Sequence, residues 1–344
     1  MKLSILIPMY NAMEFIGNTL ESLLHQDLDA SDYEIVIMDD GSTDDCTAIV
    51  KEYMKTHKNI VLHTQKNAGV VPTRKRLHKL AKGDFIYNID ADDYLIYDAL
   101  GKILHIAIEK DLDIIGFDIL TTEEKKLFTS DKTFPTSYNV TTGVEHFATH
   151  NNVLQGTGWY LISRRFMLEN KLDFGDGVYV MDILFTYSSL LKAKRVVYLD
   201  IDIQRYLQSP QSMQRNPNHE HTRKLATEYC SVIGKLNVLI EKTKSNPEIL
   251  YQKAAITLKS MTSHMIFLMF ALIIKSDMKV KEIDTLLSSL KRINIYPMKG
   301  LTEGTNYSLK FKSAVFLYNR RYLFYPLLFP LRKAYKKSLV KLPI

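Results

Sequence analysis

The chain has 344 residues, of which 46% are hydrophobic and 24% are charged, and these ordinary globular values exclude a disordered chain and a polytopic membrane protein. Its formal net charge of +7 arises at one end, because residues 310–344 carry nine Lys or Arg and no Asp or Glu. The preceding residues hold 36 basic and 38 acidic side chains, so no nucleic-acid-binding surface is predicted.

The length exceeds what one hydrophobic core usually organises, so we expect a domain of roughly 200 residues and a second unit. Cys46 and Cys230 lie far apart, which favours neither a disulfide framework nor a zinc site. The N-terminal apolar run is too short for a signal peptide. The longest apolar run, Met265–Ile274, has ten residues, about half of a membrane span, so no transmembrane helix is predicted.

The first 120 residues alternate β-branched runs with helical patterns, which predicts a parallel sheet covered by helices on both faces. The expected strands are 3–8, 33–38, 59–63, 84–89 and 112–117, and the expected helices are 12–26, 43–57, 72–81 and 98–110. The first four strands run into polar loops, "PMYN", "DDGSTDD", "QKNAG" and "DADD". Because open parallel sheets bind ligands beyond the carboxyl ends of their strands, these loops predict a ligand site at that edge.

The middle of the chain has a mixed pattern, with helices expected at 143–150 and 180–193 and strands at 158–163 and 195–200. Long helices are then predicted at 220–242, 247–274 and 280–292. In the last 35 residues aromatic side chains alternate with Lys and Arg, and Pro326 and Pro330 should interrupt any long helix there.

Three carboxylates, those of Asp90, Asp92 and Asp93, follow the fourth strand within four residues. Carboxylates this close repel one another and raise their pKa values unless a cation neutralises them, so the cluster predicts a bound cation. Taken alone, "DADD" could also be a solvated loop, and "DDGS" a turn followed by a Ser or Thr helix cap.

Four segments in order, "SILIPMYNAMEFIGNTLESLLHQ", "YEIVIMDDGSTD", "NAGVVPTRKRLHKLAKGDFIYNIDADD" and "GWYLISRRF", resemble glycosyltransferase family 2, whose enzymes have the GT-A fold. The resemblance runs from about residue 3 to residue 213. It implies an α/β, Rossmann-like domain with a mostly parallel sheet at 1–215, and leaves 216–344 as a mostly helical C-terminal region with a basic, aromatic tail.

The resemblance implies a nucleotide-sugar site at the loop edge of the sheet. Asp40 would reach the nucleobase or ribose, and Pro8, Tyr10 and Asn11 would wall that pocket. Asp90 would face the ribose. Tyr10 could equally be an ordinary core tyrosine.

Asp92 falls on the metal-binding position of the family's D-x-D element, which implies Mn²⁺ or Mg²⁺ bridging the donor diphosphate. Asp93 would instead cap the following helix. Arg74 lies where the family has an arginine near the nucleotide, although a solvated helix face is the alternative. The loop around 204–215 resembles a lid, with Arg205 or Arg215 closing over the diphosphate.

The family's general base is the Asp of a Glu-Asp pair that opens a helix, and Asp182 takes that place here with Met181 before it. A helix-start carboxylate favoured by the helix dipole is the alternative for Asp182, and Asp176 competes for the base role. Trp159 resembles an aromatic near the acceptor, or it is a core residue.

The resemblance implies a metal-dependent, inverting transfer of a sugar from a nucleotide-sugar, most often a UDP-sugar, to a hydroxyl of a saccharide or lipid-linked acceptor in surface polysaccharide or glycan synthesis. A non-catalytic nucleotide-sugar-binding or scaffold relative at the membrane is the alternative. A nucleotidyltransferase would need a glycine-rich triphosphate loop near the N-terminus, and "PMYNAMEF" is not one.

The basic segment 310–344 favours attachment to an anionic membrane surface, or else a helix packed on the protein or a dimer interface. Together these features indicate a cytoplasmic protein held peripherally on the inner face of the membrane. The sequence leaves the donor sugar, the acceptor and the oligomeric state open.

Overall fold

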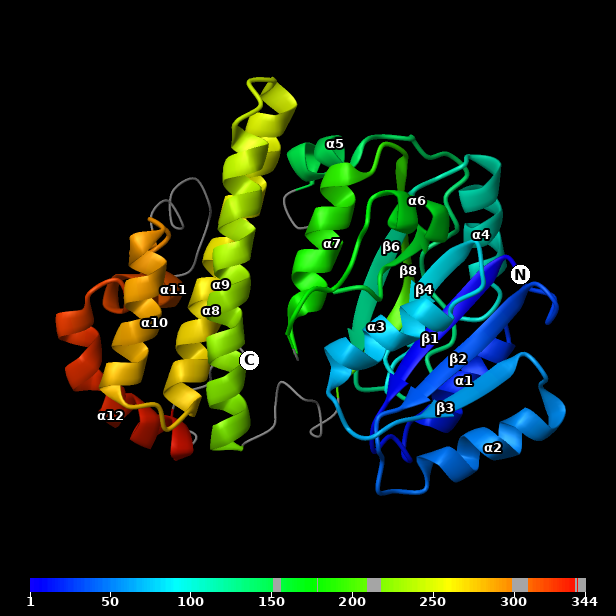
Figure 1. Cartoon of the computed structure of the whole chain (residues 1–344), viewed down its shortest axis with the longest axis horizontal. Coiled ribbons are helices and arrows are strands. Elements are labelled where there is room, and N and C mark those ends of the chain that lie inside the picture. The colour runs from blue at the N-terminus through cyan, green and yellow to red at the C-terminus, as the bar shows by residue number, and fades with distance from the viewer. Residues whose placement is uncertain (151–155, 178, 209–217, 299–308, 338, 340–344) are drawn as a thin grey trace. The chain divides into compact units, whose positions relative to one another are not determined.

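The computed structural model describes residues 1–150, 156–177, 179–208, 218–298, 309–337 and 339 (Figure 1). The chain divides into two compact units. The first comprises Met1–His146 with Val153–Ser209, and the second Phe147–Asn152 with Pro210–Ile344. The boundary predicted between residues 215 and 216 lies outside the described residues.

The first unit is built on one eight-stranded sheet with the order β3-β2-β1-β4-β7-β6-β8-β5. Its strands are β1 (Leu3–Met9), β2 (Tyr33–Asp39), β3 (Ile60–Thr64), β4 (Phe85–Asn88), β5 (Tyr94–Leu95), β6 (Ile114–Thr122), β7 (Tyr160–Ser163) and β8 (Val196–Leu207). Strand β7 is antiparallel to β4 and β6, and β5 is antiparallel to β8, while every other pair is parallel. The predicted mostly parallel sheet is therefore confirmed.

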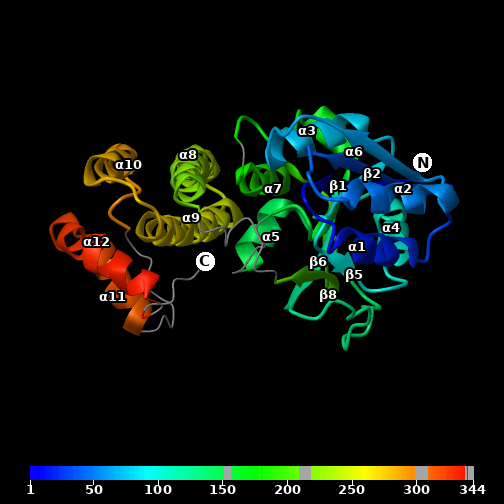
Figure 2. The same cartoon turned by 90° about the horizontal axis from the view of Figure 1, so that it is seen from below.

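Helices cover both faces of this sheet, with α1 and α4 on one side and α3 and α7 on the other (Figure 2). The helices are α1 (Ile16–Leu24), α2 (Cys46–Thr56), α3 (Val70–Leu80), α4 (Leu100–Glu109), α6 (Arg164–Glu169) and α7 (Met181–Lys192), and α5 (Gly143–Thr149) spans the division between the units. Every predicted strand and helix of the first 120 residues exists, although α1, α2 and α4 begin two to four residues later than expected and α3 begins two residues earlier.

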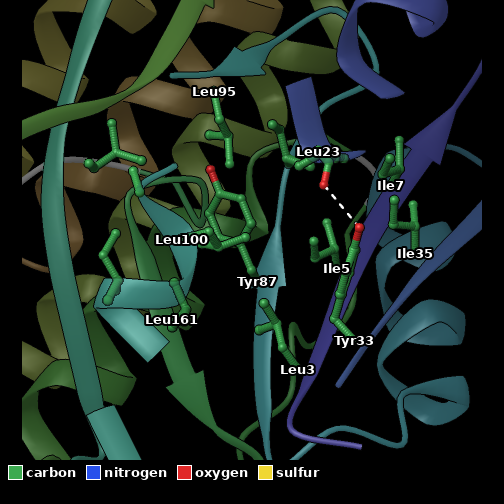
Figure 3. Packing of buried hydrophobic residues seen from close by; sticks show 14 of the residues in the cluster. Leu3, Ile5, Ile7, Leu23, Tyr33, Ile35, Tyr87, Leu95, Leu100 and Leu161 are labelled. Carbon is green, nitrogen blue, oxygen red and sulfur yellow. Dashed lines mark hydrogen bonds between the residues drawn. The ribbon is translucent and has the colours of Figure 1, made fainter. Parts of the chain in front are cut away.

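The core of the first unit lies between the sheet and α1, α2 and α4. Alternate residues of β1, Leu3, Ile5 and Ile7, are fully buried on this face (Figure 3), and Leu6 is buried on the other, because helices cover both faces of the sheet. The hydroxyl of Tyr33 donates a hydrogen bond to the Leu23 carbonyl at 3.4 Å, so the one polar atom of this buried ring has a partner. This packing holds the strands in place, and with them the carboxyl edge of the sheet from which the polar loops emerge.

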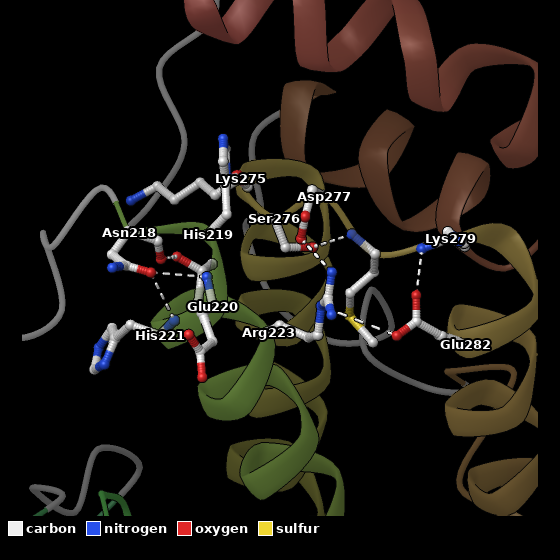
Figure 4. A network of polar contacts seen from close by, with 12 residues as sticks. Asn218, His219, Glu220, His221, Arg223, Lys275, Ser276, Asp277, Lys279 and Glu282 are labelled. Carbon is white, nitrogen blue, oxygen red and sulfur yellow. Dashed lines mark hydrogen bonds and ion pairs between the residues drawn. The ribbon is translucent and has the colours of Figure 1, made fainter.

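The second unit is helical, with α8 (His219–Lys244), α9 (Ile249–Lys275), α10 (Val280–Arg292), α11 (Leu309–Tyr318) and α12 (Arg321–Lys336). The Asn218 side chain caps α8 by accepting the backbone N–H groups of Glu220 and His221 at 2.8 and 3.2 Å (Figure 4). One turn later Arg223 donates to Asp277 at 2.8 Å, which joins α8 to the turn between α9 and α10.

Helix α9 is the one helix among the described residues that is long and apolar enough to cross a membrane, with a mean hydropathy of 1.5 in its most apolar stretch. The expectation of no such helix rested on its longest uninterrupted apolar run. However, 61% of that stretch is buried within the protein, and buried core helices pass the same test of length and composition. This feature is therefore weak support for a membrane span.

The expectation that prolines interrupt the C-terminal helix is wrong. Helix α12 continues through Pro326 and Pro330, which lie four residues apart on its exposed side. A proline removes one backbone N–H from the helix, and on an exposed face water can satisfy the carbonyl that loses its partner.

Candidate active site

The loops that follow β1 and β2 are tied to each other at the carboxyl edge of the sheet. The Asn11 N–H donates to the Ser42 hydroxyl at 2.9 Å, and the Asn11 side-chain oxygen accepts the Thr43 N–H at 2.8 Å. Asn11 has a φ of 49°, a left-handed conformation that asparagine tolerates better than most residues. Next to it Tyr10 is 53% exposed and Pro8 is partly buried, so both border this edge, and Tyr10 is not a core residue.

Asp40 is buried at the end of β2, and three groups of the protein donate to its carboxylate. Gln65 and the Ala68 N–H donate to one oxygen at 2.6 and 2.8 Å, and the Gly69 N–H donates to the other at 2.8 Å. Asp40 therefore fixes the loop that leads into α3. Its predicted contact with a nucleobase or ribose stays a prediction.

Arg74 of α3 connects the acidic loop after β4 with the start of α7. Its guanidinium donates to Asp90 at 2.6 Å and lies 3.5 Å from the Asp182 carboxylate. Burial disfavours the charge of Arg74, yet Asp90 and Asp182 outweigh burial and raise its pKa. Arg74 is therefore a buried cation held by two carboxylates, and the solvated helix face considered from the sequence is excluded.

Asp182 lies in the first turn of α7, where its own side chain accepts the Ile183 N–H at 3.0 Å. Burial raises the pKa of Asp182 and Arg74 lowers it, with a net shift upward. The side chain keeps 20% of its surface exposed, so it can still meet a ligand. Asp176, the competitor for the base role, is exposed in the loop before α7.

Asp92 differs from its neighbours because, among the residues that the structure describes, no side chain donates to its carboxylate. Burial, together with the negative charge of Asp90, raises the pKa of Asp92 to about 6. A carboxylate in this condition gains stability from a cation, and Asp90 beside it supplies further oxygen atoms. Mg²⁺ or Mn²⁺ bound with a diphosphate needs only one or two protein carboxylates, so these residues fit such an ion. No group of three or more His, Cys, Asp or Glu that could hold a metal exists within the described part of the chain.

Asp93 does not cap the helix that follows it, which corrects the expectation from the sequence. Its buried carboxylate accepts from the Gln204 amide at 2.5 Å and from the Leu207 N–H at 3.2 Å, both on β8. Gln26 and Asp27 satisfy the start of α4 instead, because their side-chain oxygens accept its first N–H groups. Asp93 thus anchors the D-x-D loop to β8.

Sequence reasoning missed His78, which lies one turn after Arg74 on α3. Its Nε2 is 2.9 Å from the side-chain oxygen of Asn88, and its ring meets the edges of Phe174 and Phe185 at centroid distances of 4.9 and 5.7 Å. Burial lowers the pKa of His78 to about 4, so the ring is neutral at pH 7. A single histidine in "RLHKL" belongs to no motif that could have revealed its burial or its contact with Asn88.

Trp159 and Arg205 both lie in the interior of the first unit. Trp159 is 1% exposed and meets the rings of Tyr160 and His146 at centroid distances of 4.9 and 6.1 Å, so its contact with an acceptor stays a prediction. Arg205 is fully buried and donates to the carbonyls of Leu127 and Thr129, so it holds the loop after β6 and does not close over a diphosphate. Arg215 lies outside the described residues.

Comparison with known proteins identifies a family and a fold. Residues 4–171 match the family model described as glycosyl transferase family 2. A poly(ribitol-phosphate) beta-glucosyltransferase of Bacillus spizizenii is 31% identical over 200 residues, which are 57% of this chain and 30% of that protein. The uncharacterized glycosyltransferase YibD of Escherichia coli is 30% identical over 60% of this chain and 61% of its own. The chain thus spans less than two thirds of the length of these relatives.

Solved structures share the fold. The crystal structure of S. aureus TarS 1–349 in complex with UDP-GlcNAc superposes with a TM-score of 0.63 at 18% identity, covering 98% of this chain and 92% of that one. The mannosyltransferase PcManGT from Pyrobaculum calidifontis, in complex with GDP-Man and Mn²⁺, gives 0.53 at 12% identity, covering 92% and 85%. These likenesses confirm the predicted GT-A fold. The family match, the curated relatives and the fold agree, and the segment 4–171 belongs to glycosyltransferase family 2.

Proposed function

We propose that this chain is a metal-dependent, inverting glycosyltransferase that moves a sugar from a nucleotide-sugar to an acceptor hydroxyl. The observation that carries the proposal is Arg74, whose one guanidinium pairs with Asp90 of the D-x-D loop and lies beside Asp182 on α7. This arrangement brings the expected diphosphate-binding element and the expected base to one edge of the sheet. Asp90 and Asp182 lie far apart in the sequence, and the packing of α7 beside α3 brings both to one guanidinium.

The donor is proposed to bind where the loops after β1, β2 and β4 emerge. Tyr10 offers an exposed ring that can stack on a base, and Pro8 and Asn11 form the adjoining wall. Asp40 supports this pocket through the loop before α3, and its carboxylate can reach the nucleotide where a ligand group replaces one of its present donors. Asp90 faces the ribose. TarS has been crystallised with UDP-GlcNAc and PcManGT with GDP-Man, and we propose a UDP-sugar as the first donor to test.

Asp92, with Asp90 beside it, would hold the Mn²⁺ or Mg²⁺ ion. When bound, such an ion neutralises the charge that develops on the departing diphosphate. The part that the chain itself plays is to present a partly buried carboxylate, whose raised pKa marks a position where a positive charge is stabilised.

Asp182 is proposed to act as the general base. Its carboxylate removes the proton of the acceptor hydroxyl while that oxygen bonds to the anomeric carbon, and the bond from this carbon to the diphosphate oxygen breaks in the same displacement. Burial raises the pKa of Asp182 and makes its carboxylate a stronger base, while Arg74 favours the ionised form. No covalent sugar intermediate is required.

The acceptor is proposed to be a hydroxyl of a saccharide or lipid-linked glycan in surface-polysaccharide synthesis, since the curated relatives include a poly(ribitol-phosphate) glucosyltransferase. The proposed location is the cytoplasmic side of an anionic membrane, reached through the basic segment 310–344. The alternative is a relative that binds the donor without turnover. Met181, which stands where the family has Glu, is the one residue that favours this alternative.

The function is tested by measuring donor binding and transfer separately. Thermal-shift assays with UDP-, GDP- and dTDP-sugars, with and without Mn²⁺, should show metal-dependent stabilisation by one nucleotide class. Asp182→Asn should keep that shift, while release of nucleoside diphosphate with saccharide acceptors falls by about 10²- to 10⁴-fold. Asp176→Asn, at an exposed carboxylate in the loop before α7, is the matched control and should keep both.

Each other outcome has its own meaning. Donor binding without turnover in the wild type would favour the non-catalytic relative. No metal-dependent shift with any nucleotide-sugar would reject the assignment of Asp92. An active Asp182→Asn variant beside an inactive Asp176→Asn variant would exchange the roles of the two carboxylates.

A further inference from the structure

The basic residues of the C-terminal segment differ in what they contact. Arg321 donates to Asp284 at 2.6 Å and to the Ser288 hydroxyl at 3.1 Å, both on α10. Arg332 donates to the carbonyls of Ile273 and Met278 near the end of α9, at 3.0 and 2.9 Å. These two arginines hold the helices of the second unit together, so their charges are already used inside the protein.

The lysines near the end of α12 are placed differently. Lys333, Lys336 and Lys337 are exposed, and within the described ranges none of them forms an ion pair. No acidic residue occurs anywhere in 310–344, so no side-chain carboxylate of this segment can neutralise them. Their charge is available to a partner.

Helix α12 has an inner and an outer side. Phe324 and Leu328 are buried, and the Phe324 ring meets Phe270 of α9 edge to face at 5.1 Å. On the other side Tyr322 is 72% exposed and Phe329 76% exposed. Large rings left in water on one helix side, with no charge between them, are typical of a surface that another phase or molecule covers.

The exposed rings and lysines form one stripe along the helix. Residues 322, 326, 329, 333 and 336 follow one another at intervals of four and three, the spacing of a single helical face. We define the α12 outer face as Tyr322, Pro326, Phe329, Lys333, Lys336 and Lys337. The rings occupy its N-terminal part and the lysines its C-terminal part.

We propose that the α12 outer face binds an anionic lipid bilayer. Aromatic rings partition into the interfacial layer of a bilayer, and lysines beside them are attracted to anionic headgroups. The surface carries positive charge and apolar rings with no acidic group, which is complementary to such a bilayer. The inference deepens the proposed function, since it names the membrane contact that would bring a lipid-linked acceptor to the enzyme.

The test is co-sedimentation of the full chain with vesicles of phosphatidylcholine alone or with about 30 mol% phosphatidylglycerol. The wild type should bind the anionic vesicles, and binding should fall at about 0.5 M salt because screening weakens exposed charges. Replacing Lys333, Lys336 and Lys337 together by Gln should lower the partition coefficient roughly 100-fold, at about fivefold per lysine. Phe329→Ser should lower it with the charges intact.

The matched control replaces three exposed lysines of the first unit, Lys51, Lys55 and Lys58, by Gln, which removes the same charge. This variant should bind vesicles like the wild type. Equal binding to neutral vesicles, equal loss in the control, or no vesicle binding by the wild type would overturn the proposal. So would dissociation of a dimer by Phe329→Ser without vesicles, because the face would then be a contact between copies.

Donor binding and vesicle binding are separate readouts. A triple-lysine variant that keeps the metal-dependent thermal shift with nucleotide-sugar but loses vesicles supports the membrane inference. A wild type that binds vesicles and no nucleotide-sugar would leave the membrane surface standing and reject the catalytic function.

Discussion

At the scale of single residues, Asp92 makes the unliganded protein less stable than it could be. Burial and Asp90 raise its pKa to about 6, above the ordinary value of 3.8, so the folded chain holds this proton more tightly than the unfolded chain. Below about pH 4 the carboxyl of Asp92 is protonated and costs the folded protein nothing. As the pH rises through about 6 it ionises, and the folded protein loses stability. At pH 7 the ionised group costs on the order of 3 kcal/mol.

Asp92→Asn should consequently raise the melting temperature of the metal-free protein at about pH 7.5, by several degrees if the penalty is of that order. The gain should shrink as the pH falls toward about 4, where the wild-type carboxyl is protonated. Adding Mn²⁺ with a nucleotide-sugar should reverse the order, because only the wild type gains from the ion. Thermal unfolding at several pH values measures all three effects.

Asp84→Asn is the control for this variant. It removes one carboxylate from an exposed position just before β4, the strand that leads into the loop of Asp92. It should change the melting temperature little at any pH. A metal-free Asp92→Asn protein that melts below the wild type at pH 7.5 would contradict the picture of an uncompensated carboxylate.

The sequence placed Asp90, Asp92 and Asp40 at one edge because parallel strands send their carboxyl ends the same way. It could not place Asp182 against Arg74, since that contact depends on how α7 packs beside α3. Nor could it assign Asp93 to β8, because the partners Gln204 and Leu207 come from a distant strand. Local pattern identifies which residues are polar and leaves open which of them meet.

At the scale of elements, a glycine of β6, Gly116, leaves the space in which the indole of Trp159, just before β7, packs. A Cβ atom on Gly116 would lie 2.4 Å from Cζ3 of Trp159, so any side chain there must displace the indole. Gly116→Ala should therefore destabilise the first unit by about 1–3 kcal/mol, the usual cost of overpacking a core. Trp159→Phe in the same chain should recover part of the loss, because the smaller ring leaves room.

Thermal unfolding of the two single variants and the double variant measures this coupling. Gly17→Ala is the control, since a Cβ there would meet its nearest neighbour, Ile49 Cγ2, at 3.9 Å, an ordinary contact. Additive effects of Gly116→Ala and Trp159→Phe would argue that the indole does not fill this space. In that case Trp159 would be free to serve the acceptor.

Elements were predictable where their periodic pattern is long. The predicted strands of the first 120 residues and helices α8, α9 and α10 exist as expected, because each is a run long enough to be recognised from its apolar residues. Strand β5 has two residues and α6 has six, too few to show a period. Helix α12 was missed for another reason. Its prolines contradict the local rule, while its inner residues Phe324 and Leu328 gain enough from burial to keep the helix intact.

At the scale of the whole molecule, the proposed chemistry and the proposed membrane contact belong to different units. Every residue assigned to the donor, the ion and the base lies in the first unit, and the α12 outer face lies in the second. The basic tail sets the net charge of the chain, while the proposed nucleotide-sugar site contains several carboxylates. The net charge of the whole chain is therefore the sum of a basic surface in the second unit and a carboxylate-rich site in the first.

This division predicts where a donor changes local stability. Hydrogen exchange of the full chain with a UDP-sugar and Mn²⁺ should slow at backbone amides in 39–45, 65–74 and 90–95, because ligand binding suppresses local opening where the ligand is held. Amides of α10 and α12 should exchange as before. In Asp92→Asn the protection should disappear from 90–95 together with the metal dependence, whereas in Asp182→Asn it should remain, since that variant keeps the donor and loses the base. Protection that falls on α12 would instead mean that the donor is read by the second unit, and the assignment of the two surfaces would have to be exchanged.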